Sequence, residues 1–332
     1  MFKNKTLLVT GGTGSFGTNF VKYILSHQKN IKKIIIYSRD ELKQFDFSRE
    51  LSENYSIKKF RFFIGDIRDK SRLMHALKDV DIVVHAAALK QVPAAEYNPF
   101  EFVKTNILGA QNVIEASINT NVKNVFALST DKASSPINLY GATKLCSDKI
   151  FTSAQSYAGS SKTKFSVIRY GNVFGSRGSV APLFLKNKNK KYFEVTHPKM
   201  TRFSITLDEA IRFVIECMKK SRGGDTFIPK LPSYNIIDLC KAIDPEKKVK
   251  IIGVRPGEKL HEEMFSIHEC DNILEDKDKY ILLQNSFEHT INKYSKKEIK
   301  LKKLKKKFSY SSDTNFNFLN IKQIRNLLNK IK

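Results

Sequence analysis

The segment that most constrains the fold is a glycine-rich turn near the start of the chain. An apolar run at residues 5–10 (KTLLVT) is followed by GGTGSFG and then by apolar residues at helical spacing as far as Leu25. In a strand–turn–helix of this kind the first glycine permits the turn, the second lets the backbone approach a pyrophosphate, and the third lets helix and strand pack closely. The helix N-terminus would face the phosphates. The sequence therefore predicts a dinucleotide site that includes Gly11, Thr13, Gly14, Ser15, Phe16 and Gly17.

Strand-like runs recur along the first half of the chain, with helical patterns between them. They lie at residues 33–37, 60–64, 82–85, 125–128 and 165–170. This alternation predicts an α/β fold, a Rossmann-type doubly wound parallel sheet with ligands at the carboxyl ends of its strands. We expect a nucleotide-binding core at 1–175 to which some later segments return, a smaller substrate-binding lobe at 176–285 with a helix from Thr206 or Asp208 to Lys219, and a basic extension at 286–332 that ends in an amphipathic helix at 321–331.

The residues that follow the second strand bear on the choice of cofactor. Ser38, Arg39 and Asp40 come at its end, and Lys43 lies four positions beyond Arg39. An acid at this place would bind the ribose 2′-hydroxyl of NAD, whereas an arginine accommodates the 2′-phosphate of NADP. We predict NADP, with NAD as the alternative because Asp40 competes.

Further cofactor contacts are expected where the next strands end. Asp66 is placed to reach the adenine amino group and Ile67 to flank the ring. His85 ends a buried strand, and we expect it to be a packed histidine and not a base. The remaining predicted cofactor contacts are Ala86, Ala87, Lys90, Asn106 and Val173.

A second motif, FALSTDKASSPINLYGATK, runs from an apolar strand through a polar loop into a helix that carries Tyr140 and Lys144. Residues four apart on a helix share a face, so the Lys144 ammonium is expected beside the Tyr140 phenol. A nearby cation lowers the pKa of a tyrosine, which is ordinarily about 10, and Tyr140 is then a candidate base for an alcohol proton. The alternative is an ordinary surface helix.

Composition excludes several classes of function. The net charge is +25, but the dense lysine block at 296–307 has no interleaved aromatic residues, so we expect a solvated basic face and no nucleic-acid partner. No run of 18 apolar residues appears, and no membrane span is expected. The four cysteines are scattered without metal-ligand spacing, which predicts no metal site and a reducing, cytoplasmic setting.

Five motifs together resemble the extended short-chain dehydrogenase/reductase superfamily: TGGTGSFG, STDK, YGATK, RYGNVFGSRGSV and RPGEKLHEEM. More narrowly, they look like its soluble inverting UDP-N-acetylglucosamine 4,6-dehydratases over about residues 3–285. SYSSDTNFNFL resembles the C-terminal segment of those enzymes. Related dehydratases that act on dTDP- or GDP-sugars carry a glutamate where this chain has Lys132, as the inverting UDP-sugar enzymes do.

The resemblance implies a mechanism. Tyr140, assisted by Lys144 and Thr130, removes the C4 hydroxyl proton while hydride moves to NADP⁺. Lys132, as a neutral amine whose pKa is lowered by nearby cations, takes the C5 proton, and Asp131 helps the C6 hydroxyl leave. Hydride returns to C6, and C5 is reprotonated from the opposite face. The substrate contacts that it implies are Lys90, Asn172, Val180, Arg202, Arg255 and Glu258.

The product would be a UDP-4-keto-6-deoxy-L-arabino-hexose for pseudaminic acid or a related surface sugar, made by a homo-oligomer. Two alternatives stay open: a UDP-sugar 4-epimerase or reductase of the same fold, and a non-catalytic NADP-binding protein.

Overall fold

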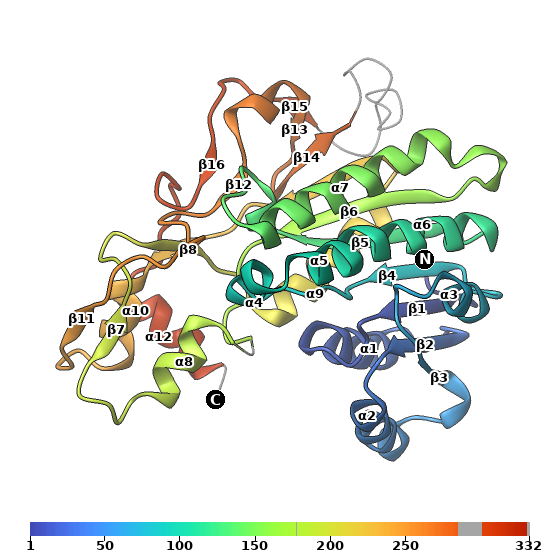
Figure 1. Cartoon of the computed structure of the whole chain (residues 1–332), viewed down its shortest axis with the longest axis horizontal. Coiled ribbons are helices and arrows are strands. Elements are labelled where there is room, and N and C mark those ends of the chain that lie inside the picture. Colours follow the sequence, from blue (N-terminus) through green and yellow to red (C-terminus); the bar gives the residue numbers. More distant parts are fainter. Residues whose placement is uncertain (177, 285–300, 331–332) are drawn as a thin grey trace.

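A single ten-stranded sheet runs through the larger lobe of the computed structural model, which describes residues 1–176, 178–284 and 301–330 (Figure 1). Its parallel strands lie in the order β3-β2-β1-β4-β5-β6-β9, and β14, β13 and β15 extend it antiparallel. The parallel strands are β1 Thr6–Thr10, β2 Lys33–Ser38, β3 Phe60–Ile64, β4 Ile82–His85, β5 Asn124–Thr130, β6 Lys164–Tyr170 and β9 Asp225–Pro229. The other three are β13 Ile273–Glu275, β14 Lys279–Leu283 and β15 Lys302–Lys303. The predicted doubly wound fold is confirmed, and its chain order reverses between β1 and β4, where such sheets bind ligands.

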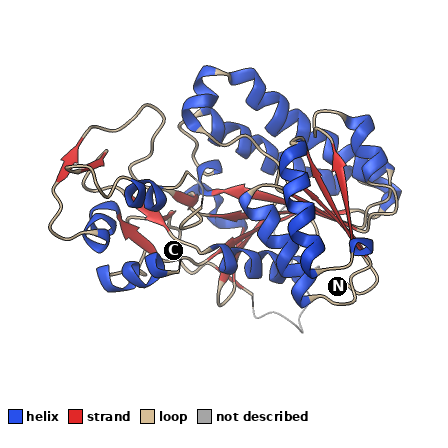
Figure 2. Ribbon diagram, turned by 90° about the horizontal axis from the view of Figure 1, so that it is seen from below, coloured by secondary structure: helices blue, strands red, loops and turns tan. Residues whose placement is uncertain are grey.

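Helices cover both faces of this sheet (Figure 2). Because side chains alternate along a strand, Leu7 and Val9 of β1 pack with α1 Ser15–His27, α2 Glu41–Asn54 and α9 Leu207–Lys220. Leu8, between them, packs with α3 Lys70–Ala76, α6 Gly109–Asn119 and α7 Leu139–Tyr157 on the opposite face. The strands are therefore buried on both sides, as in other parallel sheets.

Local signals set the ends of the helices that matter for the site. Asn138 caps α7, since its Oδ1 accepts a hydrogen bond from the Gly141 amide at 2.8 Å, and this fixes Tyr140 in the first turn. Thr206 and Glu209 form a reciprocal capping box at the start of α9, which confirms the helix predicted there.

The smaller lobe has its own core. It contains α8 Val180–Lys186, β7 Phe193–Val195 paired with β11 Val249–Ile251, β8 Thr201–Phe203 paired with β10 Ser233–Asn235, α10 Ile236–Ile243 and α12 Ile321–Asn329. Ile324 and Leu328 of α12 are buried in this core. The final amphipathic helix expected at 321–331 is thus confirmed over 321–329, whereas the basic residues 286–300 lie outside the described part of the chain.

The end of the chain returns to the middle of the molecule. β16 Tyr310–Ser311 pairs antiparallel with β12 Glu263–Phe265, and the Tyr310 hydroxyl donates to the Leu231 carbonyl at 3.1 Å. The four cysteines are unpaired. Among the described residues, no helix has the length and apolarity needed to cross a membrane.

Candidate active site

The glycine turn leaves a cradle at the end of β1. Gly11 has φ +65°, and a Cβ at this position would come within 2.8 Å of the Ala87 amide nitrogen. Only glycine adopts this conformation easily and allows the two segments to approach so closely. Gly14 is the N-cap of α1 and supplies no side-chain cap, so the first-turn amides of the helix face the turn. The predicted residue Thr13 lies on the same turn, Ser15 and Phe16 are the first residues of α1, and the Phe16 ring stacks on Phe20 at 5.3 Å.

The residues predicted to read the adenosine lie together after β2 and β3. Arg39 is exposed, and its Nη1 lies 3.7 Å from Asp66 Oδ2. Asp40 caps α2 and accepts a hydrogen bond from the Lys43 amide. The Ser38 hydroxyl accepts one from Gln44 Nε2 at 2.9 Å. The two cationic side chains among these residues therefore each lie beside a carboxylate: Arg39 beside Asp66 and Lys43 beside Asp40.

Ile67 and Asn106, which are predicted to contact the cofactor, are both buried. Ile67 is buried in the core between the sheet and α6. Asn106 lies in a π-helical turn at Val103–Leu108, and its side chain bonds the Leu89 amide and carbonyl (both 2.9 Å) and Thr143 Oγ1 (3.0 Å). These bonds fix the loop that carries Ala86, Ala87 and Lys90 against α7.

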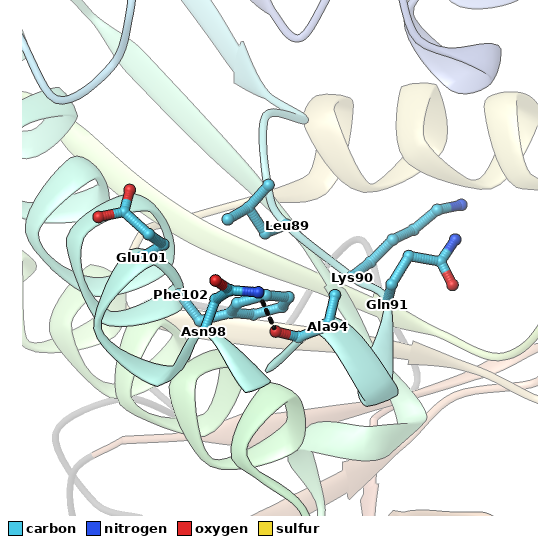
Figure 3. A pocket seen from close by; sticks show the side chains of 7 residues that line it. All are labelled: Leu89, Lys90, Gln91, Ala94, Asn98, Glu101 and Phe102. Carbon is cyan, nitrogen blue, oxygen red and sulfur yellow. Dashed lines mark hydrogen bonds between the residues drawn. The ribbon is translucent and has the colours of Figure 1, made fainter. Parts of the chain in front are cut away.

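A hollow of about 320 Å³ adjoins this loop (Figure 3). Lys90 and Gln91 extend to one side of it, and Glu101 lies on the opposite side. Two of its lining residues, Leu89 and Phe102, also pack with Tyr140. The hollow therefore lies beside the apolar cluster that contains the predicted base.

The strongest cluster of functional groups lies where β5 ends. Asp131 and Lys132 form a 3₁₀ turn directly after the strand. The Asp131 side chain is fully buried, and its Oδ1 lies 2.9 Å from Thr130 Oγ1 and 3.1 Å from Lys132 Nζ. Lys132 is only 23% exposed, and its ammonium also donates to Asn172 Oδ1 at 3.3 Å. The side chains predicted from the STDK motif and Asn172 therefore converge.

A residue without a predicted role completes this cluster. Glu262 Oε1 lies 2.8 Å from Lys132 Nζ, and the Glu262 side chain is 2% exposed. The motif RPGEKLHEEM contains Glu262, but sequence cannot indicate which of its charged residues turns inward. Its proximity to Lys132 depends on the packing of β12 Glu263–Phe265 beside the turn that carries Lys132.

The expectation that nearby cations lower the Lys132 pKa is wrong. Burial alone would lower it, but the carboxylates of Asp131 and Glu262 outweigh burial and raise the pKa of Lys132. Burial raises the pKa of the Asp131 carboxyl, which favours its acid form. For Glu262 the charges of Lys132 and Arg202 outweigh burial, so its pKa is lowered.

Tyr140 also differs from expectation. Burial raises the pKa of Tyr140 to about 12, and the groups that act to lower it are the Lys132 ammonium and a hydrogen bond from Thr130. Lys144 Nζ instead donates to the Leu128 carbonyl at 2.8 Å, and burial lowers the pKa of Lys144. Helical spacing places Lys144 and Tyr140 on the same side of α7, but burial is the largest influence on both pKa values, raising that of Tyr140 and lowering that of Lys144.

The two arginines among the predicted substrate contacts differ in exposure: Arg202 lies inside the protein and Arg255 lies on its surface. Arg202 is buried, and its Nη1 donates to the carbonyls of Thr201 (2.7 Å) and Leu260 (3.1 Å). Glu258 connects the two arginines, because its Oε1 lies 3.6 Å from Arg202 Nη2 and its Oε2 accepts the Arg255 amide at 3.3 Å. Arg255 itself is exposed.

Two further predicted contacts follow β6 in the chain. Val173 pairs with Ile205 in an isolated bridge and packs against the main core. Val180 opens α8 and is partly buried in the core of the smaller lobe. Both therefore lie where the two lobes meet.

Several bonds join the loop 130–138 to the loop 255–263. Lys259 Nζ donates to the Ser134 carbonyl at 2.7 Å, the Ser134 hydroxyl donates to Glu263 Oε1 at 2.8 Å, and Asn138 Nδ2 donates to the Gly257 carbonyl at 2.7 Å. Sequence analysis missed these links because their partners are far apart in the chain.

His85 has the packed role expected of it. It is buried, its Nδ1 lies 2.8 Å from Thr10 Oγ1, and its ring contacts Phe151. Within residues 1–176, 178–284 and 301–330, no group of three or more His, Cys, Asp or Glu side chains is arranged to hold a metal ion.

Comparison with known proteins agrees with this geometry. An inverting UDP-N-acetylglucosamine 4,6-dehydratase from Campylobacter jejuni subsp. jejuni serotype O:23/36 (strain 81-176) is 49% identical over 337 residues, covering 99% of this chain and 98% of that protein. A UDP-glucose 4-epimerase from Rickettsia bellii (strain OSU 85-389) is 44% identical over 276 residues, covering 81% of this chain and 80% of that protein.

Solved structures show the same fold. Pen from Bacillus thuringiensis superposes with a TM-score of 0.88 at 38% identity, covering all of both chains. A dTDP-glucose 4,6-dehydratase from Streptomyces venezuelae superposes with a TM-score of 0.66 at 22% identity, covering 76% of this chain and 86% of that chain. The resemblance to short-chain dehydrogenase/reductase dehydratases is thereby confirmed. Residues 7–285 match the polysaccharide biosynthesis protein family, and the chain therefore belongs to that family.

Proposed function

We propose that this chain is an NADP-dependent UDP-N-acetylglucosamine 4,6-dehydratase that inverts C5, a carbon–oxygen lyase. The observation that carries the proposal is the buried pair of Asp131 and Lys132 at the end of β5, 3.1 Å apart and electrostatically coupled to Tyr140. A sugar epimerase needs only the tyrosine, whereas loss of water also needs an acid and a second base.

The residues at the end of β1 fit a dinucleotide. The cradle at Gly11 and the uncapped first turn of α1 suit a pyrophosphate, with Thr13, Gly14, Ser15, Phe16 and Gly17 around it. When bound, the nicotinamide would accept hydride from C4 of the sugar and return it to C6. Arg39 and Lys43 would hold the 2′-phosphate, with Ser38 and Asp40 beside them.

The remaining cofactor contacts would come from the ends of the next strands. Asp66 and Ile67 would lie near the adenine, and the loop fixed by Asn106 would line the ring. The proposed residues of that loop and its surroundings are Ala86, Ala87, Lys90 and Val173.

Tyr140 would take the proton of the C4 hydroxyl. The Lys132 charge and the Thr130 hydroxyl, which both act to lower its pKa, support the role of Tyr140 as the base. Lys144, bound to the Leu128 carbonyl, would hold the cofactor ribose beside it.

The other two groups would remove water. Asp131, whose pKa is raised by burial, would donate a proton to the departing C6 hydroxyl. Lys132 would take the C5 proton, which the C4 ketone has acidified. Removal of that proton on one face and its return on the other would invert C5.

The nucleotide part of the substrate would lie across the loops 130–138 and 255–263. Arg255 and Glu258 would contact the UDP moiety, Arg202 would support them from beneath, and Asn172, Lys90 and Val180 would line the sugar. We further propose a homo-oligomer that works in the cytoplasm in the synthesis of pseudaminic acid or a related surface sugar.

The test is incubation of the purified chain with UDP-N-acetylglucosamine, with the product analysed by mass spectrometry and NMR. The expected product is lighter by one water and has the inverted configuration at C5. Lys132→Ala should abolish water loss while nucleotide binding persists; a variant that still dehydrates at the wild-type rate would contradict the assignment of the base.

A second candidate is a UDP-sugar 4-epimerase, which the 44% identity to the Rickettsia protein favours. It predicts a product of unchanged mass with an inverted C4, and turnover that survives Lys132→Ala. Absence of turnover with every nucleotide sugar would instead point to a binding protein.

A further inference from the structure

Lys132 is surrounded by acids, although a base must first lose its proton. This matters only if the proposed dehydratase chemistry is correct, and the inference below rests on that function. Asp131 and Glu262 lie on two sides of the amine, at 3.1 Å and 2.8 Å. Arg202, whose charge opposes them, lies 3.6 Å from Glu262 Oε1.

The Lys132–Glu262 contact has the geometry for a proton transfer. Nζ and Oε1 are within direct hydrogen-bond distance, and the Glu262 side chain is almost completely buried. Its second oxygen, Oε2, is buried and has no hydrogen-bond partner among the described residues, and the same holds for Asp131 Oδ2. Burial works against these anions, whereas the charges of Lys132 and Arg202 hold Glu262 ionised, so the proton moves to Oε1 only as the Lys132 charge is itself neutralised.

The charges that face Glu262 come from every neighbouring element. The 3₁₀ turn contributes Asp131 and Lys132, and β8 contributes Arg202. From β10 the phenol of Tyr234 faces the same cluster, and the residues of the surrounding loop are Glu258, Lys259 and Glu263. Groups of both charge signs therefore surround Glu262, and transfer of a proton from Lys132 to Glu262 leaves the total charge of the cluster unchanged.

We propose that Glu262 is a positioning residue that holds the Lys132 amine toward the sugar and receives its proton, which turns the ammonium into the base that attacks C5. One proton passes from Nζ to Oε1, and the ion pair becomes a neutral amine and a neutral carboxylic acid. The amine then takes the C5 proton and becomes an ammonium again, while Asp131 gives its proton to the leaving hydroxyl, which departs as water. The three groups hold two exchangeable protons before and after these steps.

The decisive variant is Glu262→Gln, which keeps the size and the hydrogen bond but cannot accept a proton. It should bind nucleotide like the wild type and still reduce its bound cofactor when UDP-N-acetylglucosamine is added, because Tyr140 is intact. Exchange of the C5 hydrogen with deuterated water, and water loss, should fall about 100-fold or more. The deficit should shrink as the pH rises, because solvent then deprotonates the amine, and Glu262→Asp should restore part of the rate.

An NMR titration of the enzyme without substrate tests the pairing of Lys132 with Glu262 directly. In protein labelled with ¹⁵N-lysine, the Lys132 ammonium signal, identified by its absence in Lys132→Ala, should titrate at lower pH in Glu262→Gln than in the wild type. Glu275→Gln, a carboxylate paired with Lys230 on a different strand, is the matched control and should change neither readout.

The outcomes separate the two proposals. Normal C5 exchange and water loss in Glu262→Gln would overturn the role of Glu262, and so would a deficit that does not change with pH or that includes cofactor reduction. If the wild type loses no water from UDP-N-acetylglucosamine, the proposed function fails. An unshifted Lys132 titration would overturn the pairing whichever reaction the enzyme catalyses.

Discussion

Two hydrogen bonds join Glu262 to Ser312. The Glu262 amide donates to Ser312 Oγ at 2.9 Å, and the Ser312 amide donates to the Glu262 carbonyl at 2.8 Å. Ser312 is fully buried, and its hydroxyl also lies 2.7 Å from Thr201 Oγ1. The end of the chain therefore fixes the backbone from which the Glu262 side chain reaches Lys132.

Ser312→Ala should weaken this support. The buried Glu262 amide would lose its acceptor, which costs about 1–3 kcal/mol of unfolding free energy. We also expect slower water loss with unchanged cofactor reduction. Denaturant unfolding and product analysis measure the two effects, and Ser52→Ala, at an exposed helix serine whose hydroxyl donates to the Ser48 carbonyl, is the control. Equal effects of the two substitutions would show that Ser312 has no special role.

Tyr140→Phe should block the first proton transfer. The fold should survive, because the ring remains in its apolar cluster with Ala95 and Phe102. Removal of a general base lowers a rate by about 10²–10⁴-fold, so reduction of the bound cofactor on addition of substrate should become correspondingly slow in stopped-flow absorbance. The control is Tyr97→Phe, at an 87% exposed position on α4 Val92–Tyr97. Cofactor reduction at the normal rate would exclude Tyr140 as the base.

Arg39→Ala should reduce the preference for NADP. A hydrogen bond to a charged group contributes about 1.5–3 kcal/mol, so NADP affinity should fall roughly ten- to a hundredfold while NAD affinity changes little. Isothermal titration calorimetry with both nucleotides measures this ratio. Arg49→Ala, on the same helix as Lys43, is the charge-matched control. If the wild type binds NAD more tightly than NADP, Asp40 determines the choice instead.

His85 should make stability depend on pH. Burial, with a smaller contribution from the Lys144 charge, lowers the pKa of His85 to about 3, against about 6.5 in an unfolded chain. Between these values the unfolded state binds one more proton, so the stabilisation is complete above the unfolded pKa and is lost as the pH falls. The expected slope is about 1.4 kcal/mol per pH unit.

The measurement is urea unfolding of wild type and His85→Asn near neutral pH and near pH 5, which is about 1.5 units below the ordinary histidine pKa. The wild type should lose about 2 kcal/mol more than the variant over this interval. His75→Asn, at an exposed position, should behave like the wild type. A parallel loss in both proteins would mean that His85 is protonated in the folded state.

The local patterns of the sequence were sufficient for the fold and for part of the site. The glycine turn before α1, the alternating strands, the helix that starts at Tyr140 and the final helix α12 follow from backbone conformation and periodicity, which act over a few residues. The convergence of Asp131, Lys132 and Asn172 could also be expected, because parallel strands end at one edge of a sheet.

The tertiary structure alone decided the electrostatics of the site. Glu262 meets Lys132 only because β12, which begins at the next residue, packs beside the turn that follows β5, and Arg202 is buried beside that carboxylate instead of lying open to solvent. The pKa of a buried group depends on the sum of charges and desolvation from residues scattered along the chain. The sequence motifs therefore identified most of the chemical groups of the site, and packing determined the direction in which the pKa of each buried group is shifted.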